Sequence, residues 1–227
     1  MNELPIKNSL KELIEINTIE DGMTEKQISI LSAAIELFSE KGYEATATSE
    51  IAKKANVAEG TIFRYYKTKK DLLFAIPTTL SKVSLFEIFL DDFNEILNAD
   101  YEHFETFLRK IVLNRKKFAS ETAPILKVII QEIPFHPELR IKILSTVVLP
   151  SINKLICLID KFKKQGEIID IPSTSIVNLI ATSIFGYLFL HYVALPELKQ
   201  DEEDLEYLIQ YIINGICKNN NVINNIT

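Results

Sequence analysis

The chain has 227 residues, of which 47% are hydrophobic and 25% are charged, a composition typical of globular proteins that bury a core. This composition excludes disorder of the whole chain. Because the sequence holds only 6 glycines and long runs without turn residues, it predicts helices throughout. The formal net charge of −6 is an average over the whole chain and does not exclude nucleic-acid binding. Attraction to phosphate depends on the charge of the contacting face.

Positive charge is concentrated in one short segment. Between Lys53 and Lys70 there are six basic residues and a single acid, Glu59, whereas acidic residues gather far downstream, for example from Asp201 to Glu206. The sequence therefore predicts a local basic surface on a protein that is acidic overall.

The first predicted helix begins near Thr24, carries apolar residues at helical spacing, and ends at Gly42, where glycine adopts a left-handed cap without strain. Thr48 is expected to be the N-cap of a short second helix. Asn56 closes the following turn, because asparagine tolerates a positive φ angle better than most residues. These elements predict two helices joined by a tight turn.

A third helix is predicted from about Ala58 to Tyr66, with Ile62 and Tyr66 buried one turn apart. A capping box, Thr68 with Asp71, then opens a fourth helix. Pro77 predicts that this fourth helix is short or kinked. Further helices are expected over 81–98, 101–120, 124–133, 137–165, 173–195 and 201–218.

The segments 48–52, 56–66 and 68–73 follow one another in the order and spacing of a helix-turn-helix, and they resemble the DNA-binding end of the TetR family of bacterial transcriptional regulators. The resemblance covers about the first third of the chain. It implies an all-α protein with an N-terminal three-helix helix-turn-helix domain and a larger helical ligand-binding and dimerisation domain. The expected boundaries are an N-terminal extension over 1–22, the DNA-binding domain over 23–76, the larger domain over 77–218 and a polar tail over 219–227.

The resemblance implies that a defined set of side chains contacts a double-stranded DNA operator: Thr48, Glu59, Gly60, Thr61, Arg64, Tyr65 and Lys69. Their chemistry suits that role, because a glutamate accepts from a cytosine amine and an arginine forks onto a guanine. The hydroxyls of Thr48 and Tyr65 and the ammonium of Lys69 are expected to position the protein on the phosphates. Arg64 is equally suited to clamp a phosphate, and the sequence leaves both roles open. Three residues depart from the family pattern, since Ala58, Glu59 and Phe63 stand where Ser, Lys and Tyr are common.

The segment from Ile176 to Leu195 is apolar on nearly all sides, and an apolar stripe follows it from Leu205 to Ile216. Polar residues and the lack of a basic flank argue against a membrane span, so no membrane partner is expected. A helix of this kind is instead buried against its own domain and a partner. In TetR-like proteins the last two long helices form the dimer, and the same homodimer is expected here.

The larger domain is also expected to hold a pocket for an unidentified apolar or amphipathic small-molecule effector, because the resembled family binds inducers in this region. The candidate lining residues are His103, Phe107, Asn178 and Tyr187. An aromatic stripe at helical spacing is more often packing than pocket, so the core interpretation stands beside this one.

The sequence shows no catalytic constellation, metal-ligand spacing or cofactor motif, so no enzyme activity, metal or cofactor is expected. The 2 cysteines and the absence of a signal peptide favour the cytoplasm. The expected function is a ligand-responsive repressor that binds a palindromic operator as a dimer. The alternative is a helical carrier or sensor of apolar molecules with weak or vestigial DNA binding.

Overall fold

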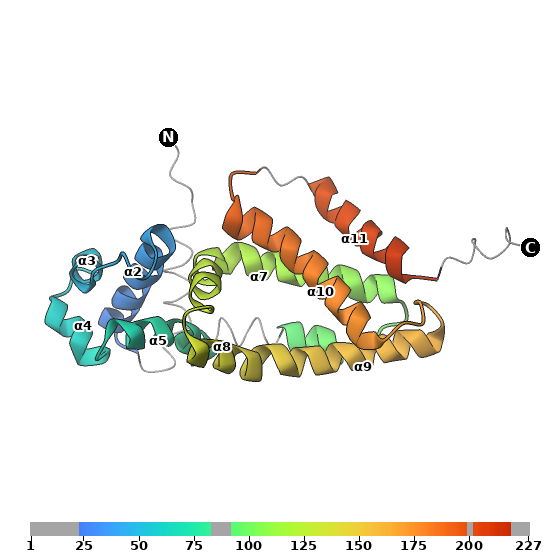
Figure 1. The fold of residues 1–227 in the computed structure, drawn as a ribbon, viewed down its shortest axis with the longest axis horizontal. Coiled ribbons are helices and arrows are strands. Elements are labelled where there is room, and N and C mark those ends of the chain that lie inside the picture. The colour runs from blue at the N-terminus through green and yellow to red at the C-terminus, as the bar shows by residue number, and fades with distance from the viewer. Residues whose placement is uncertain (1–22, 83–91, 199–201, 219–227) are drawn as a thin grey trace, which may run out of the picture. The chain divides into compact units, whose positions relative to one another are not determined.

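The computed structural model describes residues 23–82, 92–198 and 202–218, and these residues are largely helical (Figure 1). The all-α class expected from the sequence is confirmed. In chain order the helices with both ends described are α2 (Glu25–Lys41), α3 (Thr48–Lys54), α4 (Glu59–Tyr65), α5 (Lys69–Lys82), α7 (Phe104–Glu132), α8 (Pro137–Ile143), the π-helix η1 (Leu144–Val148), α9 (Leu149–Gln165), α10 (Ser173–Phe189), the π-helix η2 (Leu190–Ala194) and α11 (Glu202–Ile216). Residues 92–98 are also helical, and the rest of the helix expected over 81–98 lies mostly outside the described residues. The expected extension over 1–22 and tail over 219–227 lie outside the described residues.

The chain divides into two compact units. The first comprises Met1–Asp91 together with Ala119–Lys142, and the second comprises Asp92–Phe118 together with Ile143–Thr227. The first unit therefore contains the second half of α7 in addition to the helices α2 to α5.

In the first unit, α2 is the central helix and its N-terminus is closed by a capping box. The backbone N–H of Gln27 donates to Oγ1 of Thr24 at 3.3 Å, and the N–H of Thr24 donates to Oε1 of Gln27 at 3.0 Å. The helix ends at Gly42, whose φ of 88° is one that glycine adopts without strain. Tyr43 then folds back and packs edge-on against Phe38, with the ring centroids 5.2 Å apart.

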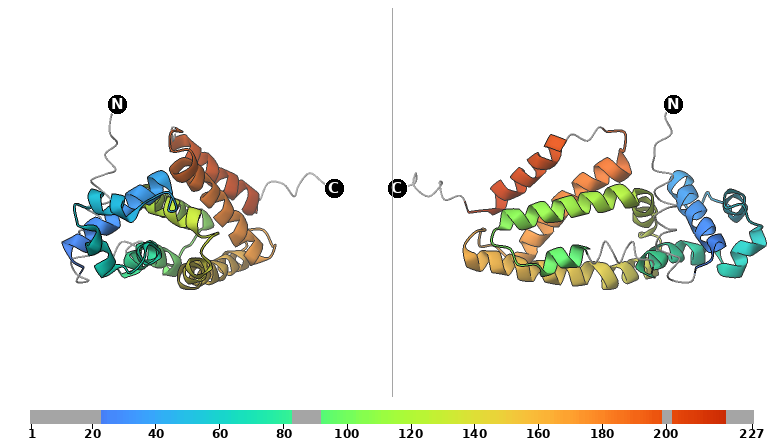
Figure 2. Two further views of the ribbon diagram at one scale, coloured as in Figure 1. Left: turned by 60° about the vertical axis from the view of Figure 1, so that its left-hand side comes forward. Right: turned by 180° about the vertical axis from the view of Figure 1, so that it is seen from behind.

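The second unit has an apolar core in which aromatic rings from two helices meet. Phe104 and Phe107 of α7 both contact Phe162 of α9, with ring centroids 5.6 and 5.7 Å apart. Leu205, Ile209, Ile212 and Ile216 of α11 are buried in the same core. Figure 2 shows α11 running beside α10 in both views, so these two helices form one face of the unit.

Two prolines lie inside helices that the sequence predicted to be interrupted. Helix α5 runs through Pro77 to Lys82, and α7 is one continuous helix through Pro124, so the expectation of separate helices over 101–120 and 124–133 is wrong. An interior proline costs about 3 kcal/mol, because one hydrogen bond is lost and the ring clashes with the carbonyl four residues earlier. In α7 the next turns bury Ile125 and Val128, and burying an aliphatic side chain stabilises by roughly 1.5–3 kcal/mol each, so packing outweighs the break.

Candidate nucleic-acid interface

The connection between α3 and α4 has the geometry of a tight helix-turn-helix. Asn56 has a φ of 55°, the one positive φ of a non-glycine residue among the described residues, which confirms the role predicted for it. The N–H of Asn56 donates to the carbonyl of Lys53 at 3.2 Å, and the N–H of Val57 donates to the carbonyl of Ala52 at 3.0 Å. These bonds pair backbone groups of the turn by which the chain passes from the end of α3 into α4.

Helix α4 is held by one apolar side chain and by the residue that ends it. Ile62 is 1% exposed, and Tyr66, the C-cap, is 9% exposed. Burial raises the pKa of Tyr66 to about 12, because the charged form of the phenol is disfavoured away from water. On the opposite side Glu59, Gly60 and Arg64 are exposed.

At the start of α4, the carboxylate of Glu59 is joined to the neighbouring helix. Oγ1 of Thr48 donates to Oε1 of Glu59 at 2.6 Å. Thr48 is the first residue of α3 and not its N-cap, so the predicted cap is wrong. The N-cap is Ala47, which makes no side-chain cap bond, and its own N–H donates to Oε2 of Glu50 at 3.2 Å.

At the end of α4, a second polar contact joins the helix to α2. The guanidinium of Arg64 donates to the hydroxyl of Tyr65 at 2.7 Å and lies 4.9 Å from the centre of its ring. Thr24, the N-cap of α2, donates to the same hydroxyl at 3.2 Å. These bonds, first from Thr24 and then from Arg64, lower the pKa of Tyr65. Thr24 was not among the predicted site residues, because its capping box marks only the start of a helix.

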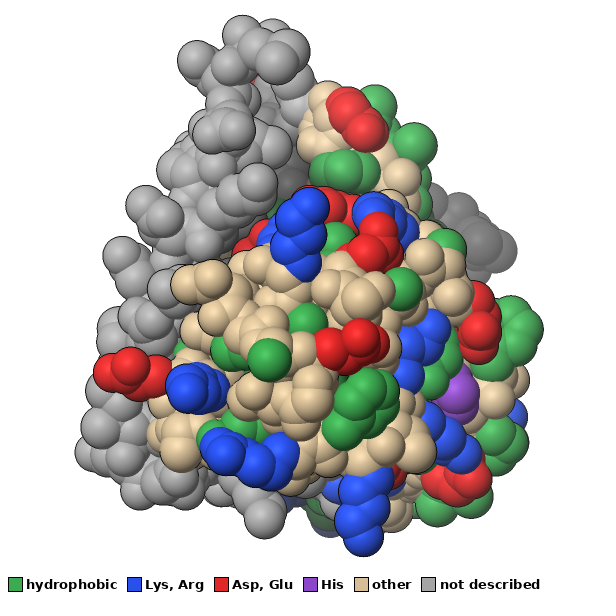
Figure 3. Space-filling model, turned by 90° about the vertical axis from the view of Figure 1, so that its left-hand side faces the viewer, with side chains coloured by type: hydrophobic (Ala, Val, Ile, Leu, Met, Phe, Trp, Pro, Cys, Tyr) green, Lys and Arg blue, Asp and Glu red, His purple; other side chains and the backbone are tan. Residues whose placement is uncertain are grey.

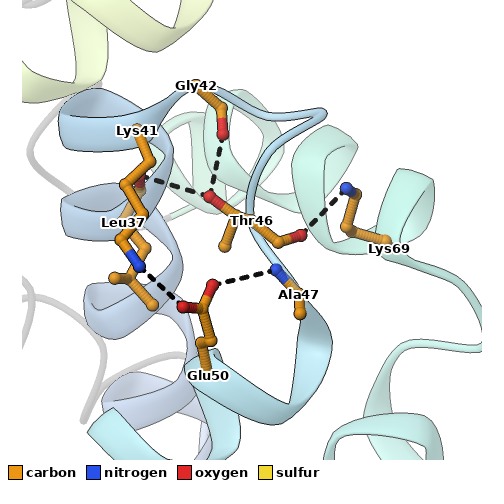
Figure 4. A network of polar contacts seen from close by, with 7 residues as sticks. All are labelled: Leu37, Lys41, Gly42, Thr46, Ala47, Glu50 and Lys69. Atoms are coloured by element: carbon orange, nitrogen blue, oxygen red, sulfur yellow. Dashed lines mark hydrogen bonds and ion pairs between the residues drawn. The ribbon is translucent and has the colours of Figure 1, made fainter.

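Lys69 holds the loop that leads from α2 into α3 (Figure 4). Its ammonium donates to the carbonyls of Tyr43, Glu44 and Thr46 at 2.7, 3.3 and 3.0 Å. It also lies 4.4 Å from the centre of the Tyr43 ring, a cation–π distance. Its ammonium, which the sequence assigned to a phosphate, is therefore already bound within the protein.

Replacing Lys69 by methionine is expected to lower the free energy of unfolding by about 1–3 kcal/mol, because the carbonyls of the loop lose a charged donor. Urea denaturation followed by circular dichroism measures this change. Lys67→Met is the matched control, since Lys67 is exposed two residues earlier. Equal stability of the two variants would show that the ammonium of Lys69 does not hold the loop.

The basic surface predicted from the sequence is smaller in the structure. Lys54 pairs with Glu36 at 2.5 Å, and Lys70 pairs with Glu138 at 3.3 Å. Figure 3 shows Lys and Arg side chains spread around an uncharged polar surface, with acids between them. Among the described residues of segment 53–70, Lys53 and Lys67 are exposed lysines with no ion pair.

The four residues proposed for an effector pocket divide between core and surface. Phe107 is 1% exposed in the aromatic core, and the ring of Tyr187, packed against that core, lies 4.5 Å from the ring of His191. The side chain of His103 is 68% exposed, and its Nδ1 lies 3.7 Å from a Glu167 carboxylate oxygen. Asn178 is exposed on α10.

The tight turn and the exposed polar face of α4 define a helix-turn-helix DNA-binding module. Residues 30–76 match the family model described as bacterial regulatory proteins, tetR family. The chain is 31% identical over 198 residues to the HTH-type transcriptional regulator YvkB of Bacillus subtilis, an alignment that spans 82% of this chain and 95% of that protein. The chain belongs to the TetR family and is a DNA-binding transcriptional regulator.

Two further similarities agree with this membership. The fatty acid metabolism regulator protein of Bacillus subtilis is 36% identical over 88 residues, which cover 39% of this chain and 41% of that protein. The crystal structure of PfmR, a TetR-family regulator from Thermus thermophilus, aligns with a TM-score of 0.67 at 18% identity and covers 82% of this chain and 97% of that one. The alternative of a carrier with vestigial DNA binding is not favoured.

Proposed function

We propose that the protein is a homodimeric repressor that binds a palindromic operator through α4 of each protomer and leaves it when an effector binds the second unit. The observation that carries this proposal is the two-sided character of α4. Ile62 anchors the helix in the first unit, while Glu59 and Arg64 remain exposed at its two ends. A helix of this kind fits the major groove of B-DNA.

The contacts divide between bases and phosphates. Glu59, Gly60 and Thr61 lie at the start of α4, the part of a recognition helix that meets base edges. A Cβ placed on Gly60 would meet nothing within 4 Å, so the surface there is open to an approaching duplex. Arg64 and Tyr65 are held toward the start of α2 and suit a phosphate. Lys69 would contribute its backbone N–H at the start of α5, because its ammonium is engaged.

The dimer interface in this proposal is the outer face of α10 and α11. Phe185 of α10 is 58% exposed, and Tyr207 and Tyr211 of α11 are 64% and 72% exposed. The two tyrosines are four residues apart and so lie on one side of the helix. Large exposed aromatic side chains on two helices that contact each other suit an interaction site, and a second copy of the same helices would bury them.

Because α10 is apolar, it must also be compared with a membrane-spanning helix. One helical run in the described part of the chain, Ser173–Ala194, is long and apolar enough to cross a membrane, with a mean hydropathy of 1.6 over its window and 22% of that window buried. Its exposed face carries Asn178 and Thr182, which do not suit lipid. A cytoplasmic dimer that buries this face against its copy accounts for the same pattern, and it keeps the protein where the DNA is.

The effector in this proposal is an apolar or amphipathic molecule bound in the second unit. Within the described residues, the hydroxyl of Tyr101 and Nδ1 of His191 are buried with no hydrogen-bond partner. Such atoms suit the polar group of a mainly apolar ligand. The similarity to a fatty acid metabolism regulator supports fatty acids as the first compounds to test for release of the operator.

Selection of bound fragments from random DNA tests the proposal directly. The wild-type dimer is expected to enrich an inverted repeat, and its affinity should fall steeply as salt rises. Arg64→Ala is expected to enrich the same repeat with lower affinity and a weaker salt dependence, as removal of a phosphate contact predicts. Enrichment of no repeat by the wild-type protein would contradict operator binding.

A further inference from the structure

The hydrogen bond between Thr48 and Glu59 joins the first turns of α3 and α4. It is 2.6 Å long and links residues eleven positions apart on the exposed side of the module. Among the described residues, this is the hydrogen bond that the side chain of Glu59 makes. The carboxylate therefore has one oxygen, Oε1, engaged by the hydroxyl, and Oε2 remains an acceptor.

Thr48 is free to make this contact because it is the first residue of α3 and not its N-cap. Oε2 of Glu50 accepts from the N–H of Ala47 at 3.2 Å, and Oε1 accepts from the ammonium of Lys41 at 2.6 Å (Figure 4). These bonds, first from Lys41 and then from Ala47, lower the pKa of Glu50 and keep it charged. The start of α3 is thus closed without Thr48.

Glu59 in turn is not used to close its own helix. Ala58, the N-cap of α4, makes no side-chain cap bond, and Glu59 lies exposed in the first turn. A glutamate at this place has three side-chain torsions to fix before it can meet a base edge. A short hydrogen bond from a neighbouring helix fixes them before DNA arrives, which is the advantage of preorganisation.

Building on the proposed operator binding, we propose that Thr48 is a positioning residue for base readout. Its hydroxyl holds the carboxylate of Glu59 so that the second oxygen accepts from the exocyclic amine of a cytosine in the major groove. The carboxylate is an acceptor only, and cytosine presents an amine donor at that edge of the groove. In this arrangement Thr48 does not touch a phosphate, in contrast to the role expected from the sequence.

The test compares the affinity of the full-length dimer for the selected repeat and for variants substituted at each position. Thr48→Val keeps the shape of the side chain and removes the donor. We expect it to reduce the preference for cytosine at one symmetric position in each half-site about five-fold or more, while preferences at other positions stay unchanged. Thr48→Ser is expected to restore the preference, because the hydroxyl returns.

Two further variants complete the experiment. Thr106→Val is the matched control, since it makes the same change at an exposed threonine of α7 in the second unit, outside α10 and α11, and it should leave every preference unchanged. In the background of Glu59→Ala, which has no side-chain acceptor, Thr48→Val should have no additional effect on the preference for cytosine, because the bond that it removes is already absent. Thermal unfolding of each variant shows that the module stays folded.

Three results would overturn the assignment. If Thr48→Val weakens binding to all sequences alike and reduces the salt dependence, Thr48 holds a phosphate. If Thr48→Val changes nothing, the hydroxyl does not position Glu59. If the wild-type dimer selects a repeat but Glu59→Gln leaves all its preferences intact, Glu59 does not read a base. Absence of any selected repeat is a separate outcome that overturns the proposed function and this assignment together.

Discussion

The double variant Phe185→Asp with Tyr211→Asp is expected to be monomeric and to bind the operator at least about 100-fold more weakly than wild type. Both side chains are more than half exposed on the outer face of α10 and α11, at 58% and 72%. In the proposed dimer they meet their copies, and four buried carboxylates without partners cannot be accommodated there. Loss of the dimer removes the effective concentration that links the two recognition helices, a factor of roughly 10²–10⁴.

Analytical ultracentrifugation measures the mass, and fluorescence anisotropy with labelled operator measures the affinity. Phe135→Asp is the control, because Phe135 is 76% exposed but lies outside α10 and α11. This control should remain dimeric and bind normally. A double variant that stays dimeric would place the interface elsewhere on the chain.

Ile62→Ala is expected to destabilise the first unit by about 2–5 kcal/mol, with loss of operator binding and retention of the dimer. Ile62 is 1% exposed beneath α4, so its truncation leaves a cavity. The helix has seven residues and no side-chain cap, so packing is what keeps it formed. Chemical denaturation measures the change in stability, and anisotropy measures the loss of binding.

Phe63→Ala on the same helix provides the comparison, since Phe63 is 44% exposed. Its effect on stability should be within about 1 kcal/mol, because little apolar surface is removed from contact. If Ile62→Ala retained full stability and full operator affinity, the role of Ile62 as the anchor of the recognition helix would be wrong.

Features governed by local chemistry could be predicted from the sequence. Asn56 was expected to adopt a positive φ, and it does, because asparagine is among the few residues that tolerate it. The capping box at the start of α5 was also predicted. The N–H of Thr68 donates to Asp71 at 2.9 Å and the N–H of Asp71 donates to Thr68 at 3.0 Å. Each of these features depends on residues no more than three positions apart.

Features that depend on contacts across the fold could not be predicted. Thr48 was expected to cap α3, but Glu50 closes that helix and Thr48 bonds to Glu59 of α4. Lys69 was expected to meet a phosphate, and its ammonium is bound by carbonyls of the loop after α2. In both cases a side chain had several chemically suitable partners, and the partner that it meets lies eleven or more positions away in the chain.

The apolar stripe of α11 shows a similar difference. From the sequence, the stripe that includes Leu205, Ile209 and Ile212 was expected to be shared with a partner. In the structure these three residues are buried in the second unit itself, and the surface left for a second copy carries Tyr207 and Tyr211. Periodicity identified the buried face of the helix, and the fold determined what covers it.

The central claim is that two copies of α4, held by a dimer, read two half-sites on one side of a duplex. The most direct test measures affinity for a series of duplexes in which the two half-sites of the selected repeat are moved apart one base pair at a time. For the proposed dimer we expect a maximum when the half-site centres are one helical turn, about 34–36 Å, apart or at a multiple of that distance, and a steep loss at half a turn more. An affinity that does not depend on the spacing would contradict the account.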